Sequence, residues 1–181
     1  MSLPTDSNGV IVSLPSVSSG GTTSVNGILV LGIDTANNNK SSGITRYTAD
    51  GFGQIKTIFN GITYGAIIDS GSNELFFSPP STSLLPDCGL PNQGWFCPSS
   101  LTTFWATNEG ASGSPGNEVL FQIGNFNSLT GAGNGSKVFP DIGASLPGSF
   151  DWGLPFYFGR NIYVGIYGTT SSLGTGPYFA Y

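Results

Sequence analysis

The sequence predicts an all-β fold with one or two short helices. There are 28 Gly and 12 Pro among the 181 residues, so turns recur at short intervals. Short apolar runs end in Gly, Asn, Ser or Pro, and no long stretch repeats apolar residues with helical spacing. Such a pattern is typical of a barrel or sandwich of antiparallel strands.

The first half of the chain predicts five strands. Apolar runs at 10–14 and 25–33 indicate the first two, the second interrupted by glycines. Alternating residues at 44–48 and 54–59 predict a hairpin around Asp50-Gly51, because Asp-Gly favours a tight turn. Asn60-Gly61 predicts a further tight turn, followed by a strand at 62–68.

The second half alternates short apolar runs with polar loops. A strand is expected at 75–77, a helical turn at 81–85, and a short helix at 98–105 capped by Ser99. After a Gly/Ser loop at 110–116 come a strand at 119–123 and a loop at 125–136. A dense apolar segment, 150–167, ends in a strand that begins at residue 162.

One lobe is expected, because the chain is long enough for a single domain with a sizeable core. We place this lobe at residues 10–170, after a leader or linker at 1–9 and before a C-terminal tail at 171–181. Met1-Ser2-Leu3 resembles a cloning leader, so we expect further sequence upstream in the natural protein.

The charge of the chain limits its partners. Only 8% of residues are charged, the net charge is −5, and the five basic residues form no cluster, which argues against nucleic-acid binding. No apolar run approaches the length of a membrane span. Because acid leaves so few positive side chains to repel one another, we expect the fold to tolerate low pH.

The two cysteines, Cys88 and Cys97, lie nine residues apart in a segment rich in Pro and Gly. The spacing suits a disulfide that closes a small loop, although two free thiols are the alternative. With a Ser/Thr/Asn-rich and Lys-poor composition, the pair favours an exported protein: periplasmic, on the cell surface or secreted. The chain has no histidine, so we expect no zinc site, and we expect no cofactor.

Asp69 is the strongest candidate for chemistry. The strand at 62–68 runs directly into it, and Ser70, Gly71 and Ser72 follow. A carboxylate at the end of a buried strand is costly unless donors stabilise it. Two hydroxyls and the unhindered backbone of a glycine, which permits a positive φ and close approach, could supply these donors. The alternative is a plain hairpin with a solvated aspartate.

The segment IIDSGSNELFF resembles the catalytic loop of pepsin-like and retroviral-type aspartic proteases. The resemblance implies a closed or partly open β-barrel lobe in which Asp69 is one member of an aspartate dyad that shares a proton and activates water. It implies that Ser70 bridges to the partner loop, Gly71 permits the turn and Ser72 hydrogen-bonds the carboxylate. Gly153 matches the glycine that ends a hydrophobic strand close to this loop.

FDWGLPFYFGR, together with IDSGSN, is similar to a bacterial family catalogued as domain of unknown function 3443. Its members resemble two-lobed aspartic proteases, so this chain would be the second lobe. The resemblance implies that the other aspartate comes from a missing N-terminal lobe or from a second copy related by two-fold symmetry. The expected substrate is a peptide, and an isolated monomeric lobe should be inactive.

The other acidic residues are weaker candidates. Asp34 is expected in a turn because Ala36 replaces the glycine of the motif, and Asp151 is expected to be structural, bonding backbone N–H groups. Asp87 and Asp141, beside prolines, are expected to be solvated, and the position of Glu74 is open.

Other functions compete with the peptidase hypothesis. The absence of histidine excludes Ser-His-Asp and Cys-His catalysis. Asn73 departs from the pepsin-like pattern, which favours a catalytically silent protein with the same fold that binds or inhibits. The Ser/Thr/Gly/Asn-rich composition also suits an adhesion module. The three tryptophans could line a groove, but the core is the stronger expectation for them: Trp95, Trp105 and Trp152.

Overall fold

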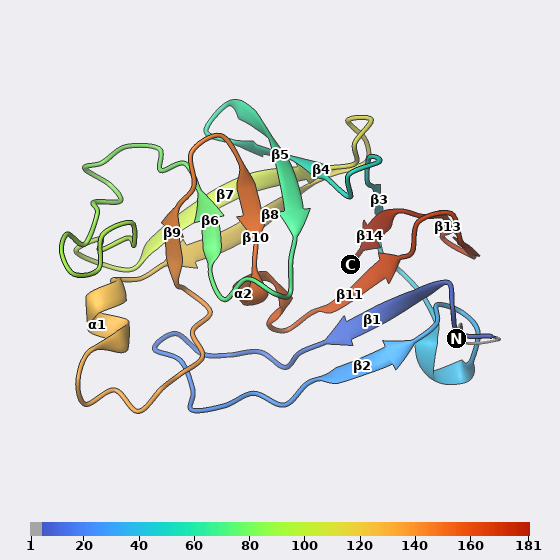
Figure 1. Cartoon of the computed structure of the whole chain (residues 1–181), viewed down its shortest axis with the longest axis horizontal. Helices are drawn as coiled ribbons and strands as arrows, with labels where there is room; N and C mark the ends of the chain where they lie inside the picture. The colour runs from blue at the N-terminus through green and yellow to red at the C-terminus, as the bar shows by residue number, and fades with distance from the viewer. Residues whose placement is uncertain (1–4) are drawn as a thin grey trace.

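The computed structural model describes residues 5–181, and β-strands dominate it (Figure 1). The strands of the first half are β1 (Gly9–Ser13), β2 (Ile28–Leu31), β3 (Arg46–Thr48), β4 (Ile55–Phe59), β5 (Ile62–Ile68) and β6 (Leu75–Phe77). Those of the second half are β7 (Thr102–Glu109), β8 (Gly116–Ile123), β9 (Gly143–Ser145), β10 (Phe150–Trp152), β11 (Asn161–Gly165), β12 (Thr170–Ser171), β13 (Gly174–Thr175) and β14 (Tyr178–Ala180). The helical segments are short: η1 (Asn37–Asn39), α1 (Phe126–Thr130) and α2 (Leu154–Tyr157).

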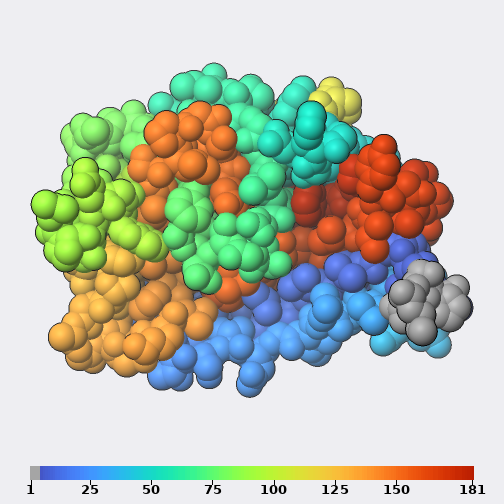
Figure 2. All heavy atoms as spheres, in the orientation of Figure 1, coloured from blue at the N-terminus to red at the C-terminus, as the bar shows by residue number. Residues whose placement is uncertain are grey.

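These strands form two main sheets, so the expectation of a mostly β fold with one or two short helices is confirmed. A seven-stranded sheet, in the order β8-β7-β4-β5-β10-β6-β9, curls into a half-barrel. A five-stranded antiparallel sheet has the order β2-β1-β11-β14-β3, and β12 and β13 form a separate hairpin. Figure 2 shows the blue N-terminal segments along the lower edge of the molecule, with red C-terminal segments above them on the right.

Aromatic side chains fill the curve of the seven-stranded sheet. The ring centroid of Phe77 lies 5.3 Å from those of both Phe59 and Phe150, and Phe121 packs against all three. Trp152 is fully buried at the edge of this cluster. Because these rings come from four different strands of the sheet, they fix the position of β10 relative to its neighbours.

The position of β10 determines which residues lie next to the segment between β5 and β6. This strand lies between β5 and β6, parallel to the first and antiparallel to the second. Asp151 pairs with Ile67 on one side and Phe76 on the other, so these three residues share one face of the sheet. The segment between β5 and β6 therefore has to pass around the end of β10.

The hairpin predicted from 44–48 and 54–59 is wrong in its pairing. A turn does form at Asp50, whose carboxylate accepts hydrogen bonds from the backbone N–H groups of Phe52 and Gln54. The strands on either side enter different sheets, however: β3 pairs with β14, and β4 pairs with β5 and β7. Long-range pairing, which local turn signals do not encode, decides the outcome.

The short helix predicted at 98–105 is also wrong, because Thr102–Glu109 is strand β7. It pairs along its full length with β8, and its β-branched and aromatic residues suit that pleated surface. Conversely, the loop predicted at 125–136 contains helix α1. The side chain of Asn125 caps this helix by accepting from the Ser128 N–H at 3.0 Å.

The two ends of the chain contribute to the five-stranded sheet. Residues 1–4 of the expected leader lie outside the described residues. Asn8, within the expected linker, accepts a hydrogen bond from the Ile33 N–H at 2.8 Å, and β1 begins at the next residue. The segment expected as a tail forms β14, which lies between β11 and β3 with Tyr178 and Ala180 buried. Residues 178–180 are thus part of the five-stranded sheet.

The predicted disulfide is present. Cys88 and Cys97 are joined, and no described cysteine is free. The backbone N–H of Cys88 donates to Trp95 and that of Cys97 donates to Pro86, so the closed loop is also held by main-chain hydrogen bonds. The alternative of two free thiols is excluded.

Candidate active site

Asp69 lies at the tip of β5, partly buried, where donors surround its carboxylate. The Gly71 N–H donates to Oδ1 at 2.8 Å, and the Ser72 hydroxyl donates to Oδ2 at 2.9 Å. The backbone N–H of Asp69 itself donates to the carbonyl of Trp152 at 3.0 Å, which fixes the loop to β10. The side chain is therefore held by its own loop and is not a freely solvated turn aspartate.

The glycine of this loop acts through close approach alone. Gly71 is not among the described residues with positive φ, so the left-handed conformation that glycine permits is not used here. A Cβ at this position would lie 3.1 Å from Oδ1 of Asp69, tighter than an ordinary contact. Ser70, by contrast, is exposed.

Gly153 passes directly over the returning part of the same loop. The Leu154 N–H donates to the carbonyl of Ser72 at 2.7 Å. A Cβ on Gly153 would lie 2.8 Å from that carbonyl and closer still to the carbonyl of Glu74. Only glycine fits at this crossing, which brings the end of β10 against the Asp69 loop.

Asp151 is buried close to Asp69, which the sequence pattern did not predict. It is only 6% exposed, and the Ser72 hydroxyl lies 2.8 Å from its Oδ2, while no backbone N–H reaches it among the described residues. Its Oδ1 is buried without a hydrogen-bond partner among residues 5–181. The expectation that Asp151 bonds backbone N–H groups is therefore wrong, because β10 delivers it to the hydroxyl that also holds Asp69.

The surroundings of Asp151 are acidic and poorly solvated. Burial, with the charge of Asp69 adding to it, raises the pKa of Asp151 to about 6 even though the Ser72 hydroxyl opposes the shift. Burial, followed by the charge of Asp151, also raises the pKa of Glu74. Burial likewise raises the pKa of Tyr157, whose hydroxyl donates to the carbonyl of Ile68 at 3.2 Å.

The remaining acidic residues lie away from this loop. Asp34 has a φ of 57° and accepts from the Ser41 N–H at 2.8 Å, as expected of a turn residue. Burial raises its pKa, but the hydroxyls of Ser172 and Ser41 outweigh burial and lower it overall. Asp87 is exposed and accepts from two backbone N–H groups of its own loop.

The expectation of a solvated Asp141 is wrong. This side chain is 2% exposed, and its Oδ2 accepts from the Ser19 hydroxyl at 2.9 Å. Its neighbours come from the N-terminal loop and from the loop at Gly124, which wrap around it. Asp141 is thus buried in part by a segment more than a hundred residues away in the sequence. The proline beside it, on which the expectation of a solvated loop rests, carries no information about such contacts.

The tryptophans take different positions. Trp152 is fully buried in the aromatic core, as expected, and Trp95 stacks on Phe126 with ring centroids 4.1 Å apart. Trp105 is 59% exposed on the outer face of β7, so the core expectation is wrong for it.

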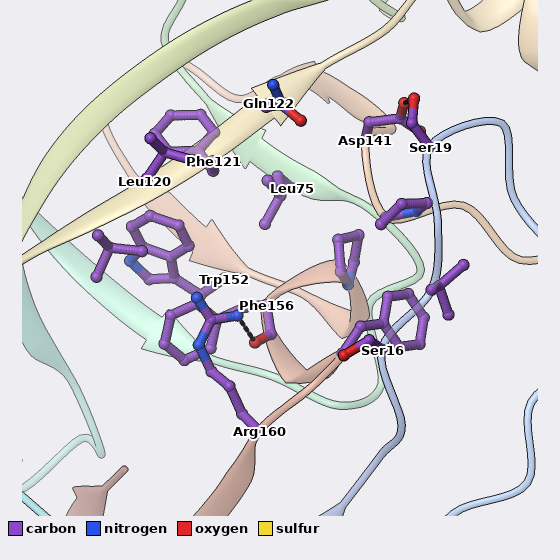
Figure 3. A pocket seen from close by; sticks show the side chains of 15 residues that line it. Ser16, Ser19, Leu75, Leu120, Phe121, Gln122, Asp141, Trp152, Phe156 and Arg160 are labelled. Atoms are coloured by element: carbon purple, nitrogen blue, oxygen red, sulfur yellow. Dashed lines mark hydrogen bonds between the residues drawn. The ribbon is translucent and has the colours of Figure 1, made fainter.

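The pocket in Figure 3, of about 290 Å³, is separate from the Asp69 loop. It is lined by Leu75 and Trp152, which lie on the face of the sheet opposite Asp151 because neighbouring residues of a strand point to opposite sides. The guanidinium of Arg160 lies 4.6 Å from the ring centroid of Phe156 at its mouth and donates to the carbonyl of the same residue.

The described residues contain neither a cluster of metal-ligand side chains nor a helix suited to cross a membrane. Across 5–181, no three or more His, Cys, Asp or Glu residues cluster as metal ligands would. No helix in the same part of the chain has the length and apolar character that a membrane span requires.

The comparisons with known proteins identify the family but not its fold. No curated protein and no solved structure matches the chain. One family model matches residues 1–181, the whole sequence. The family resemblance carried by IDSGSN and FDWGLPFYFGR is thereby confirmed: the chain belongs to the family described as protein of unknown function (DUF3443).

Proposed function

We propose that this chain is one lobe of an aspartic peptidase with a pepsin-like fold, and that Asp69 is one of its two catalytic aspartates. The second aspartate comes from another lobe, either an N-terminal one or a second copy related by a two-fold axis. The substrate is a peptide bond. The lobe alone, as a monomer, is inactive because it presents a single aspartate of the required pair.

The observation that carries this proposal is the pair of donors on Asp69. The Gly71 N–H and the Ser72 hydroxyl each take one oxygen of the carboxylate, at 2.8 and 2.9 Å. This orients the side chain at the end of a rigid strand, where part of it stays accessible. A catalytic carboxylate needs such an orientation, because the reacting groups must be held in a productive geometry.

The crossing of β10 supports the pepsin-like fold of the lobe. In that family, the aspartate loop lies against a glycine that ends a hydrophobic strand. Here β10 lies between the two strands that flank the loop, and the next residue, Gly153, has its backbone against the carbonyls of Ser72 and Glu74. This contact is the one that the resemblance leads us to expect.

Asp151 is not the second catalytic aspartate. It is 6% exposed and lies behind Ser72, so it cannot share a substrate water with Asp69. In the proposed mechanism, Asp69 and its partner from the other lobe hold one proton between them. The ionised carboxylate takes a proton from the water as this attacks the peptide carbonyl, and the protonated one donates to the carbonyl oxygen.

The test compares wild type with Asp69→Asn on a denatured protein substrate at acidic to neutral pH, with the chain joined to its second lobe. We expect the substitution to remove measurable turnover, because the asparagine amide cannot accept the proton of the water. The matched control is Glu118→Gln, which removes a carboxylate from the exposed face of β8 and should leave turnover unchanged.

Equal activity in wild type and Asp69→Asn would reject Asp69 as catalytic. If the paired protein shows no turnover at all, the catalytically silent alternative stands, in which the fold binds peptides without cleaving them. Sedimentation of the single chain completes the test, because a monomer that cleaves the substrate would contradict the need for a second lobe.

Export is the second part of the proposal. The disulfide between Cys88 and Cys97 supports an oxidising compartment, because such bonds rarely persist in the cytosol. Fractionation of cells that express the natural gene tests this. Recovery of the protein with reduced cysteines in the cytosolic fraction would contradict export.

A further inference from the structure

Ser72 lies between two carboxyl groups that are far apart in the sequence. Its Oγ is 2.9 Å from Oδ2 of Asp69 and 2.8 Å from Oδ2 of Asp151. A serine hydroxyl has one hydrogen to donate and can accept at its oxygen. Both contacts are therefore hydrogen bonds at the same time only when one of the carboxyl groups carries a proton and donates it to Ser72.

The geometry identifies Asp151 as that donor. Asp69 accepts from the Gly71 N–H on its other oxygen, whereas the other oxygen of Asp151 is buried without a partner. An ionised carboxylate in such a position would leave its charge unsatisfied, so burial favours the protonated form.

The groups that face Asp151 favour the same assignment. Asp69 lies on the loop after β5, Glu74 precedes β6, and Tyr157 belongs to α2. The first two are acidic, and the charge of Asp69 adds to burial in raising the pKa of Asp151 to about 6. Like charges at close range prevent full ionisation of both carboxyl groups.

We propose that protonated Asp151 is a positioning residue for Asp69: its O–H donates to the Ser72 oxygen, which turns the Ser72 hydroxyl toward Asp69. When Asp151 loses its proton to solvent, one hydrogen remains among three oxygens, and Asp151 competes with Asp69 for it. The hydrogen bond from Ser72 to Asp69 is thus complete only at a pH low enough to keep Asp151 protonated, and Asp151 is not a member of the catalytic pair. This inference deepens the proposed function, since Asp69 is the carboxylate concerned, but the hydrogen-bond chain itself needs no catalysis.

The experiment is a titration of the carboxyl carbons by NMR on the ¹³C-labelled chain, over roughly pH 3 to 9, the range that ordinary and raised carboxyl pKa values span. Asp69→Asn and Asp151→Asn assign the two signals. We expect Asp151 to titrate near pH 6. The Asp69 signal should show a second inflection at the same pH, because it loses the Ser72 hydrogen bond there.

Two variants separate the hydrogen bond from a through-space effect of charge. In Asp151→Asn, the side-chain amide donates permanently to Ser72, so the second inflection of Asp69 should disappear. In Ser72→Ala, Asp151 still titrates, but most of the inflection at Asp69 should be lost because the connecting hydroxyl is gone. Amide spectra of each variant that overlay on wild type away from the loop verify the fold.

Three results would overturn the proposal: titration of Asp151 in the ordinary range of a solvated aspartate, an Asp69 signal without a second inflection, or an undiminished inflection in Ser72→Ala. The wild-type titration decides the first two even if a variant fails to fold. Because peptide cleavage enters none of these measurements, the peptidase proposal and this one can fail separately.

Discussion

The backbone of Gly153 lies so close to the carbonyl oxygens of Ser72 and Glu74 that no side chain fits between them. The Leu154 N–H donates to the Ser72 carbonyl at the same point, so the end of β10 and the Asp69 loop form one tightly packed unit. Glycine is required here for close approach, since Gly153 has a φ of −69°, which any residue can adopt.

Replacing Gly153 by alanine should therefore destabilise the protein. The added methyl group must displace backbone atoms, and overpacking of this kind costs about 1–3 kcal/mol or more in the free energy of unfolding. Urea unfolding followed by circular dichroism measures the change. Gly51→Ala is the matched control, because a Cβ there meets nothing within 4 Å, and it should unfold like wild type. A Gly153→Ala protein as stable as the control would contradict the close contact between Gly153 and the Asp69 loop.

A buried hydrogen-bond chain holds Trp152, the neighbour of Asp151. The indole N–H donates to Oγ1 of Thr57 at 2.9 Å, and the Thr57 hydroxyl donates to Oδ1 of Asn108 at 2.6 Å. Thr57 and Asn108 are both fully buried. Thr57→Val keeps the shape but leaves a buried donor and a buried acceptor unpaired.

We expect Thr57→Val to lower the free energy of unfolding by about 2–4 kcal/mol, because each unpaired buried group costs about 1–3 kcal/mol. Thr57→Ser retains the hydroxyl and should lose only the contribution of one methyl group, about 1 kcal/mol. Urea midpoints of the two variants, measured side by side, check the prediction. Equal loss in both would show that packing, and not the hydroxyl, holds Trp152.

The disulfide should contribute through the unfolded chain. Joining Cys88 to Cys97 closes a small loop, which is worth about 2–3 kcal/mol in the chain-entropy model. The double variant Cys88→Ser, Cys97→Ser should lose this amount in urea unfolding. A reducing agent should lower the midpoint of wild type toward that of the double variant and leave the double variant itself unchanged. Insensitivity of wild type to reduction would contradict the prediction.

Local signals predicted much of the site. The strand at 62–68 is found with the expected bounds, and the motif that follows it correctly indicates that Ser72 donates to Asp69. The turn at Asn60-Gly61 also forms, with φ values of 51° and 75°. In each case, the interacting groups lie within a few residues of one another, so the sequence pattern contains the whole interaction.

Contacts between distant segments could not be predicted in this way. Asp151 reaches Ser72 across 79 residues, and only the insertion of β10 between β5 and β6 brings them together. The burial of Asp141 and the strand at Thr102–Glu109 likewise depend on partners elsewhere in the chain. One signal was available: an aspartate between two aromatic residues of a short apolar strand, which is expensive to bury without a specific partner.

The raised pKa of Asp151 also predicts how stability depends on pH. The ordinary pKa of this carboxyl is 3.8 and its value in the folded protein is about 6, so the folded state binds more protons than the unfolded state between these values. The contribution of this group to stability is therefore fully present below pH 3.8 and is lost as the pH rises through 6. A shift of this size corresponds to about 1–3 kcal/mol.

We expect the urea midpoint of wild type to fall as the pH rises from about 4 to about 7, across the two pKa values. Asp151→Asn has no such proton to lose and should show a much smaller fall, with a remainder from Glu74, whose pKa is also raised. Glu118→Gln removes an exposed carboxylate and should retain the full fall. If Asp151→Asn and wild type fall in parallel, Asp151 is ionised in the folded protein throughout, and the Ser72 hydroxyl then cannot be reserved for Asp69.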